Sequence, residues 1–387
     1  MFDYKYIIIG AGISGSVLAE RIVSCLNEKV LLIEKRNHAG GNCYDYKDKS
    51  GIIVHKYGPH LFHTDNKEVF DYLSKFTEWR NYNHKVLAYI DGKKIPLPFN
   101  FNSINKLFKP EKADKFKDKL LLHYKENIKV PIFKLLENHD EDLKFLANFI
   151  YEKIFLNYTI KQWGKNPKEL DASVSARVPV FIGYDDRYFN DLYQSVPLNG
   201  YTELFKNMLN HPNIKLSLNT DFKNISSLKE GKIYIYGKEY KGLLIYTGPI
   251  DEIFGYKFGR LKYRTIKMEF EEHKTKYFQE SAVVNYPNEY EFTRITEFKH
   301  IHPAETDKTV ILKEYPKDAL SDEDIKYYPF FDDENGERYK KYSRLAKDYR
   351  NLILLGRLAE YKYYDIDDAV KRALEVYEKI NNYITQI

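Results

Sequence analysis

The fold of this chain is decided by Tyr6-Ile7-Ile8-Ile9-Gly10-Ala11-Gly12-Ile13-Ser14-Gly15, in which an apolar strand runs into the pattern G-x-G-x-x-G. Apolar residues at helical spacing follow, and a second apolar run, Val30–Ile33, ends on Glu34. Strand, glycine-rich turn, helix and strand in this order form the βαβ unit that binds a dinucleotide. The sequence therefore predicts a Rossmann-like α/β domain at the start of the chain.

Each residue of this motif has a physical task. Gly10 permits a tight turn, Gly12 lets the backbone approach a pyrophosphate, and Gly15 allows close packing of helix on strand. The pyrophosphate is expected at the helix N-terminus, beside Ser14, where free N–H groups and the helix dipole favour anions. Glu34 follows Gly10 at about the spacing of a carboxylate that binds a ribose hydroxyl.

The residues after the second strand narrow the cofactor to FAD. They read E-x5-G-G over Glu34-Lys35-Arg36-Asn37-His38-Ala39-Gly40-Gly41-Asn42, which resembles the extended signature of FAD enzymes of the glutathione-reductase and amine-oxidase type. Lys35, Gly41 and Asn42 therefore join the expected FAD-binding residues. No second G-x-G-x-x-G follows a strand later in the chain, so we expect electrons to come from an external reductant, NAD(P)H or a reductase.

Composition excludes several classes of protein. The chain has 387 residues, with 61 basic and 56 acidic side chains spread along it, far from the basic footprint of a nucleic-acid-binding protein. Its two cysteines cannot form a disulfide framework, and no Cys/His spacing typical of a metal site is present, so no metal is expected. No apolar run predicts a membrane span, and the chain opens on a strand rather than a signal peptide. We expect a cytoplasmic protein.

Later apolar runs predict that the FAD-binding domain is discontinuous. Leu243–Pro249 and Asn351–Gly356 read as buried strands of its sheet, and Asp367–Ile384 as a terminal helix. Between them we expect an antiparallel β-sheet domain, with a hairpin that turns at Asp91-Gly92, and an inserted helical domain. The predicted division is 1–85 (FAD-binding, first part), 86–100 (hairpin of the β-sheet domain), 101–195 (helical, substrate-binding, with a mobile loop), 196–260 (FAD-binding, second part), 261–345 (antiparallel β-sheet) and 346–387 (FAD-binding, third part).

Several motifs outside the FAD unit are more specific. They are His55–Thr64, Lys161–Trp163, Leu170–Pro179, Tyr184–Phe189, Phe292–Arg294, Tyr327–Pro329 and Gly356–Asp367. In these residues, and in their order from the first strand to the last helix, the chain resembles bacterial UDP-galactopyranose mutase. A generic amine oxidase carries none of these later motifs.

The resemblance implies reversible isomerisation of UDP-galactopyranose to UDP-galactofuranose by reduced FAD. Flavin N5 attacks the anomeric carbon, UDP leaves and returns, and the ring contracts through an iminium intermediate. The implied partners are the UDP-sugar, the reductant and a second copy of the chain in a homodimer. Whether UDP-N-acetylgalactosamine is also a substrate stays open, because Asn42–Tyr44 and Asn81–Lys85 depart from many relatives.

The resemblance also implies residue roles. Arg177 and Arg294 match the pair that holds the diphosphate, a task that suits the always charged guanidinium fork. His60 matches a loop beside the flavin and is a third catalytic candidate. Substrate contacts are implied for Asn83, Tyr158, Trp163 of the mobile loop, Tyr188, Tyr328 and Tyr363, and flavin contacts for Arg357, Asp365 and Ile366.

Two other functions are compatible with the FAD motif. An FAD-dependent oxidoreductase of the amine-oxidase type would share the Glu34 and Gly40-Gly41 region, but it would not need Arg177, Arg294 or the tyrosines. A non-catalytic binding protein of the same fold, as GDP-dissociation inhibitors are, would not keep an intact FAD motif and would purify colourless. Assays of turnover with and without reduction separate these hypotheses from the mutase.

Overall fold

The computed structural model describes residues 4–167 and 179–385, and every helix and strand named below belongs to this part of the chain. Its Rossmann-like sheet is parallel, with the strand order β12-β2-β1-β16-β22. The five strands come from three distant parts of the sequence: β1 (Tyr6–Ile9), β2 (Val30–Ile33), β12 (Ile214–Ser217), β16 (Leu243–Tyr246) and β22 (Leu352–Leu354). The sequence predicted all of them except β12.

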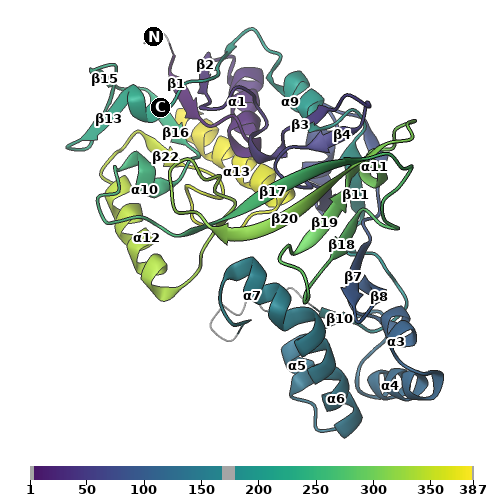
Figure 1. The fold of residues 1–387 in the computed structure, drawn as a ribbon. Helices are drawn as coiled ribbons and strands as arrows, with labels where there is room; N and C mark the ends of the chain where they lie inside the picture. Colours follow the sequence, from purple (N-terminus) through teal and green to yellow (C-terminus); the bar gives the residue numbers. More distant parts are fainter. Residues whose placement is uncertain (1–3, 168–178, 386–387) are drawn as a thin grey trace.

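Both faces of the three central strands, β2, β1 and β16, are covered, which explains why these strands read as continuous apolar runs. Ile8 and Leu32 pack against three helices on one face, whereas Ile7 and Leu31 face a small antiparallel sheet on the other. The helices are α1 (Ile13–Leu26), α9 (Tyr201–Leu209) and α13 (Ile366–Thr385), and the small sheet is β13 (Ser226–Lys229), β14 (Lys232–Ile235) and β15 (Lys238–Tyr240). In Figure 1 these elements form the upper part of the molecule.

A seven-stranded sheet carries the second half of the structure. Its order is β21-β17-β20-β19-β18-β7-β8, and every pairing is antiparallel except β18 with β7. Asp91 and Gly92 both have positive φ, as a type I′ turn requires, so the predicted hairpin is confirmed. The strands are β7 (Val86–Ile90), β8 (Lys93–Leu97), β17 (Tyr263–His273), β18 (Val283–Asn285), β19 (Arg294–Glu297), β20 (Thr309–Asp318) and β21 (Tyr328–Pro329).

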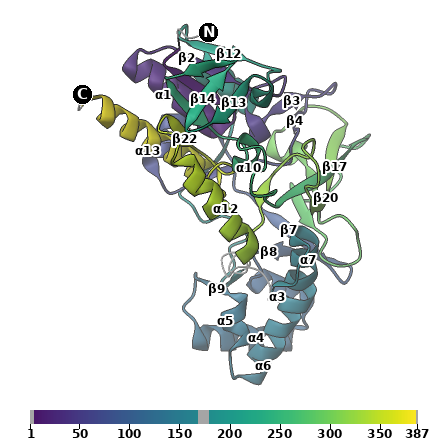
Figure 2. The ribbon, with the colours of Figure 1, turned by 90° about the vertical axis from the view of Figure 1, so that its left-hand side faces the viewer.

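The helical part has its own apolar core, in which Phe116, Leu146 and Ile150 are fully buried. It lies at the opposite end of the molecule from β1 and α1 in both views (Figures 1 and 2). Its first helix, α3, packs on β8, and its last helix, α7, reaches back to β20 of the large sheet. The elements are α3 (Phe101–Leu107), α4 (Pro110–His123), β9 (Lys129–Pro131), α5 (Ile132–Leu136), α6 (Glu141–Ile150), the π-helical turn Tyr151–Leu156, α7 (Asn157–Trp163) and β10 (Pro179–Phe181).

The longest helix without a sequence prediction is α12 (Asp333–Ala346). Its sequence is polar and contains Gly336, and its few buried side chains are Asn335, Tyr342 and Ala346, so no apolar stripe marks it. The remaining elements are β3 (Asp45–Lys47), β4 (Ile53–His55), β5 (Phe62–Thr64), α2 (Lys67–Leu73), β6 (Trp79–Asn81), β11 (Tyr193–Pro197), α10 (Ile250–Ile253) and α11 (Phe298–Ile301), with short 3₁₀ turns at Gly41–Cys43 and Phe222–Asn224.

Candidate active site

The glycine-rich turn after β1 is too tight for side chains. Gly10 has a φ of +99°, and its amide donates to the Ile33 carbonyl at 2.8 Å. A Cβ on Gly10 would lie 2.1 Å from Thr247 Oγ1, and a Cβ on Gly15 would lie 2.0 Å from the Gly10 carbonyl oxygen. Both distances are far inside van der Waals contact, so only glycine fits at these two positions.

A second glycine turn lies directly against the start of α1. Gly41 has a φ of +56°, and a Cβ on it would lie 2.9 Å from the Cα atom of Gly12. Gly12 precedes α1, and no side chain of the described residues caps the helix there. The first N–H groups of α1 are therefore available to a ligand anion, and this is where the sequence analysis expected a pyrophosphate.

Glu34 ends the second strand of the unit in a fixed orientation. Its side chain is buried, Oε2 accepts a hydrogen bond from the Ala11 amide at 2.9 Å, and Oε1 accepts one from the Arg36 amide at 2.9 Å. Each carboxylate oxygen can accept a further bond. The geometry thus supports the predicted contact with a ribose hydroxyl.

A cavity of about 820 Å³ lies along these turns, within the size range of sites for organic ligands. The structure brings all residues that the sequence assigned to the cofactor to its wall. They are Gly10, Gly12, Ser14, Gly15, Glu34, Lys35, Gly41, Asn42, His60, Arg357, Asp365 and Ile366. The two glycine turns, the open helix N-terminus and the fixed carboxylate fit a dinucleotide of the FAD type.

His60 lies on the cavity wall with a defined tautomer. Its Nδ1 is 2.9 Å from the Gly58 carbonyl oxygen, and since a carbonyl only accepts, Nδ1 carries the proton and Nε2 does not. Burial, together with the charges of Arg357 and Arg294, lowers the pKa of His60 to about 4. The ring is therefore neutral at pH 7, and its Nε2 is a hydrogen-bond acceptor.

Arg294 lies on β19 and is held from one side. Its Nε donates to Oε2 of Glu314 at 2.9 Å, and Glu314 is 1% exposed. Burial raises the pKa of Glu314, and the charge of Arg294 opposes that rise. Burial alone would lower the pKa of Arg294, but the charge of Glu314 raises it. The ion pair engages Nε and leaves both Nη groups, among the described residues, for a ligand anion.

Three predicted tyrosines, Tyr158, Tyr188 and Tyr328, lie close enough to this guanidinium to interact with its charge. Tyr158 comes from α7 and Tyr328 from β21, and the Tyr188 amide donates to the His84 carbonyl at 2.8 Å. Burial raises the pKa of Tyr158 to about 12, and Arg294 partly offsets this rise. Tyr158 is thus a protonated donor at neutral pH.

Aromatic rings link Arg294's surroundings to the cofactor cavity. The rings of Tyr328 and Tyr363 stack at 5.7 Å with a tilt of 12°, and the Arg357 guanidinium lies 5.3 and 5.2 Å from their centroids. The ring of Trp163, at the end of α7, lies 6.2 Å from that of Tyr328. Arg357 therefore belongs to both groups, because it also lines the cavity.

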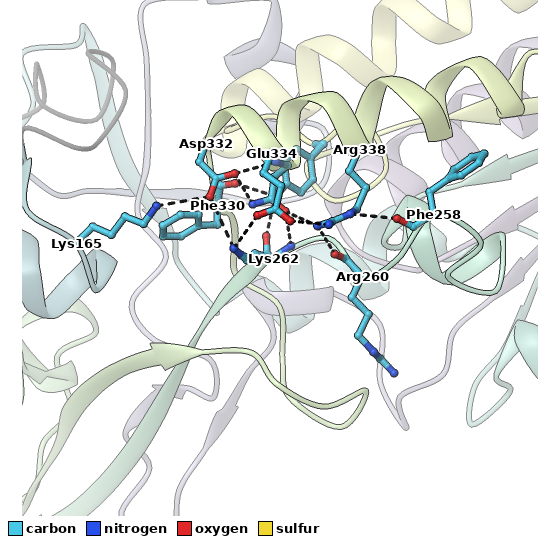
Figure 3. Close-up of polar contacts among 10 residues, drawn as sticks. Lys165, Phe258, Arg260, Lys262, Phe330, Asp332, Glu334 and Arg338 are labelled. Atoms are coloured by element: carbon cyan, nitrogen blue, oxygen red, sulfur yellow. Dashed lines mark hydrogen bonds and ion pairs between the residues drawn. The ribbon is translucent and has the colours of Figure 1, made fainter.

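A polar cluster fixes the elements that carry Tyr328 and Trp163 (Figure 3). Asp332 follows β21, caps α12 by accepting from the Asn335 amide at 2.8 Å, and receives Lys165 at 3.6 Å. Lys165 follows Trp163 by two residues and lies 4.9 Å from the Phe330 ring. The end of α7 is thereby tied to the start of α12, although the two are far apart in sequence.

Two further site residues were predicted, Arg177 and Asn83. Arg177 lies outside the described residues, with the rest of 168–178. Asn83 is exposed in the connection between β6 and β7, next to His84, whose carbonyl accepts from the Tyr188 amide. Asn83 is therefore the sequence neighbour of a residue, His84, that is hydrogen-bonded to Tyr188.

Several residues that line the cavity were not predicted from the sequence, among them Arg36, Thr247 and Tyr327. Arg36 lies over the Tyr57 ring at 4.4 Å, and its buried Nη1 has no hydrogen-bond partner within the described chain. A buried donor without a protein partner can donate to a ligand in the cavity. Position was the available signal, because Arg36 lies inside the E-x5-G-G stretch and Thr247 lies near the end of the predicted strand Leu243–Pro249.

The described residues give no sign of a metal centre or of a membrane segment. No group of three or more His, Cys, Asp or Glu side chains in residues 4–167 and 179–385 could hold a metal ion. Across the same residues, none of the helices combines the length and the apolar character that spanning a bilayer needs.

Comparison with known proteins decides the family. The family model described as UDP-galactopyranose mutase matches residues 153–363, and a NAD(P)-binding Rossmann-like domain matches residues 8–76. The chain belongs to the UDP-galactopyranose mutase family. By this membership it is an isomerase and a flavoprotein, with the α/β fold expected from its sequence.

Relatives match over nearly the whole chain. A dTDP-fucopyranose mutase of Escherichia coli is 38% identical over 374 residues, which are 96% of this chain and 97% of that protein. A probable UDP-galactopyranose mutase of Klebsiella pneumoniae is 35% identical over 97% of this chain and 94% of its own length. The fold is similar to the crystal structure of reduced UDP-galactopyranose mutase, with a TM-score of 0.74 and 18% identity over 99% of this chain and 95% of that one.

Proposed function

We propose that this chain interconverts UDP-galactopyranose and UDP-galactofuranose with reduced FAD. One observation carries the proposal beyond family membership: Arg294 offers two Nη groups among tyrosine hydroxyls, close enough to the cofactor cavity for its charge to act on His60. A fixed cation with neutral donors suits a diphosphate leaving group. It would repel the cationic substrate of an amine oxidase, which argues against that alternative.

We propose FAD as the flavin. The helix N-terminus of α1 would bind the pyrophosphate, Glu34 a ribose hydroxyl, and the residues around His60, Arg357 and Asp365 the isoalloxazine side of the cavity. When bound and reduced, the flavin would supply the nucleophile for the anomeric carbon. External NAD(P)H or a reductase would supply the electrons, and the working unit would be a homodimer.

The protein would hold the nucleotide while its bond to the sugar breaks. Arg294, with Arg177 as its proposed partner, would bind the diphosphate oxygens and stabilise the charge that develops on UDP. Tyr158, Tyr188, Tyr328 and Tyr363 would donate to the same oxygens without adding charge. Trp163 and Asn83 would bound the substrate side, and neutral His60 would accept a hydrogen bond beside the flavin.

A second substrate has a specific observation in its favour. The E. coli relative at 38% identity is a dTDP-fucopyranose mutase, and relatives at 34–35% are UDP-galactopyranose mutases. The same diphosphate site would serve both nucleotides, which differ in the base and at the sugar. We therefore propose dTDP-fucopyranose as the alternative substrate, and UDP-N-acetylgalactosamine as a further one.

The test is a chromatographic assay of the purified holoenzyme with UDP-galactofuranose, with and without dithionite. Conversion to UDP-galactopyranose in the reduced sample alone supports the proposal. The same assay with dTDP-fucofuranose and UDP-N-acetylgalactofuranosamine ranks the substrates by kcat/KM. A yellow, folded protein that converts none of the three in reduced form contradicts the proposed function.

A further inference from the structure

A buried histidine lies behind the loop that carries His60. His55 ends β4 and is 0% exposed. Its Nδ1 accepts a hydrogen bond from the backbone amide of His60 at 3.0 Å, and its Nε2 lies 3.2 Å from Nε2 of His302. His55 thus joins the backbone of the cavity loop to a second buried histidine.

The donors and acceptors in this chain determine each tautomer. The His60 amide can only donate, so Nδ1 of His55 is unprotonated, and the neutral ring carries its proton on Nε2. This proton is donated to Nε2 of His302, which must therefore be protonated on Nδ1. Burial favours the neutral form of both rings, and the pKa of each is lowered.

Aromatic rings pack around His55, so water cannot take over a hydrogen bond that is lost there. The rings of Tyr201, Phe298 and His302 lie 5.8, 5.7 and 5.3 Å from its centroid. His302 is 4% exposed and follows α11, which packs beside β4. A bond lost inside such a site leaves its partner unsatisfied, which costs more than the bond itself contributes.

We propose that His55, oriented by His302, is the positioning residue of the loop Gly58–His60: its Nδ1 fixes the His60 amide, so that the His60 ring presents an unprotonated nitrogen to the cavity. The ring has one further anchor, the Nδ1 bond to the Gly58 carbonyl, and Gly58 has a φ of +88°. Two hydrogen bonds therefore determine both the place of His60 and the nitrogen that remains free.

The chemistry that this nitrogen would meet is a hydrogen-bond donor. A reduced flavin carries an additional ring N–H compared with the oxidised form, so an acceptor held in place would favour the reduced state. This part of the inference rests on the proposed function, whereas the tautomers and the fixed amide do not. A test on the wild-type protein can thus fail or succeed independently of the enzymatic activity.

Two variants of His55 separate positioning from packing. In His55→Asn the side-chain oxygen can replace Nδ1 as the acceptor, and in His55→Gln the longer amide can replace Nε2 but not Nδ1. We expect His55→Asn to retain kcat and the flavin midpoint potential, and His55→Gln to lower kcat about tenfold and to shift that potential. His302→Gln, which keeps an acceptor for His55, should resemble wild type, and His302→Leu should resemble His55→Gln.

His211→Gln is the matched control. Nδ1 of His211 also accepts a hydrogen bond from a backbone amide, that of Asn213 at 3.1 Å, and this bond lies away from the cavity. It should change neither kcat nor the potential. Nitrogen-15 NMR of histidine-labelled wild-type holoenzyme should show the proton of His55 on Nε2, and this readout stands even where a variant fails to fold. A proton on Nδ1, or equal values for His55→Asn and His55→Gln, would overturn the proposal.

Discussion

The cofactor cavity and the surroundings of Arg294 are built in different ways. Around the cavity, Gly10, Gly15 and Glu34 lie within one βαβ unit. A Cβ added to Gly10 or Gly15 would lie only 2.0 to 2.1 Å from neighbouring atoms, which leaves little freedom for substitution. Around Arg294, side chains from α7, β19, β20 and β21 converge, and each is held by other side chains. A local turn creates the first region, and the packing of distant elements creates the second.

This difference separates the two proposed tasks of the protein, cofactor binding and substrate binding. Backbone geometry that a short sequence determines can be shared by many dinucleotide-binding proteins, and the match of residues 8–76 to a NAD(P)-binding Rossmann-like domain illustrates this. Side chains that meet from four elements can change without disturbing the cofactor. Variants of the two regions should therefore have different effects. Variants around Arg294 should lose turnover and keep the flavin, whereas variants around the cavity should lose both the flavin and stability.

The largest effect is expected at Arg294. Arg294→Ala should lower kcat/KM about a thousandfold, because it removes a cation from a developing negative charge, while the flavin content stays at the wild-type level. Arg177→Ala is predicted to behave in the same way. Steady-state kinetics measure kcat/KM, and the flavin-to-protein absorbance ratio measures the flavin content.

Arg372→Ala is the control for Arg294→Ala. Arg372 has a similar exposure of 26%, and it also pairs with a glutamate, Glu360, outside the cavity. Loss of flavin in Arg294→Ala would remove the distinction between the regions.

The converse loss is expected at Gly15. Gly15→Val places a side chain 2.0 Å from the Gly10 carbonyl oxygen, so the turn must open. We expect a colourless protein and a fall of about 3 kcal/mol in the free energy of unfolding, measured by urea denaturation. Gly336→Ala is the matched change, because a Cβ there meets nothing within 4 Å, and helix propensity should raise stability by about 0.5 kcal/mol. A yellow Gly15→Val protein would show that the turn tolerates a side chain.

The histidines behind the cavity predict a pH dependence of stability. Burial, with the charge of Arg80, lowers the pKa of His302 to about 4 in the folded protein. Below about pH 6.5, His302 binds a proton in the unfolded chain but not in the folded chain. Stability present above about pH 6.5 is therefore lost as the pH falls towards 4. The loss at pH 5 is about 2 kcal/mol for this one group.

Denaturation of wild type and of His302→Gln at pH 7 and pH 5 measures this contribution together with any change at His55, the titratable group hydrogen-bonded to His302. The stability difference between the two pH values should be smaller in the variant by about that amount. Equal differences would mean that His302 is protonated as readily in the folded chain as in the unfolded one.

The smallest effect is expected at Tyr328. Tyr328→Phe removes one hydroxyl and keeps the ring that stacks on Tyr363 under Arg357. We expect kcat/KM to fall about tenfold, the value of one hydrogen bond to a charged group. Tyr339→Phe alters a comparable stacked pair, with Tyr361 at 5.5 Å, and should leave kcat/KM unchanged. A similar loss in both variants would assign the effect of Tyr328→Phe to packing.

The parts of the fold that were predictable have strong local patterns. Four strands of the parallel sheet, β1, β2, β16 and β22, are continuous apolar runs, and the β7–β8 hairpin turns at Asp-Gly. The helix α12 and the strand β12 were missed for the opposite reason. α12 buries Asn335 and Tyr342 through hydrogen bonds rather than through an apolar stripe, and β12 is a half-exposed edge strand. Such elements depend on partners that a sequence window does not contain.

The sequence by itself determined the dinucleotide unit, its FAD-type extension and the family, because those depend on residues that are close together in the chain and on the backbone conformations that only glycine adopts readily. Only the tertiary structure decided that Glu314 holds Arg294, that Lys165 ties α7 to Asp332, and that His302 orients His55. Each of these contacts joins residues 20 to 247 positions apart. Their geometry follows from how sheets and helices pack, which no local pattern encodes.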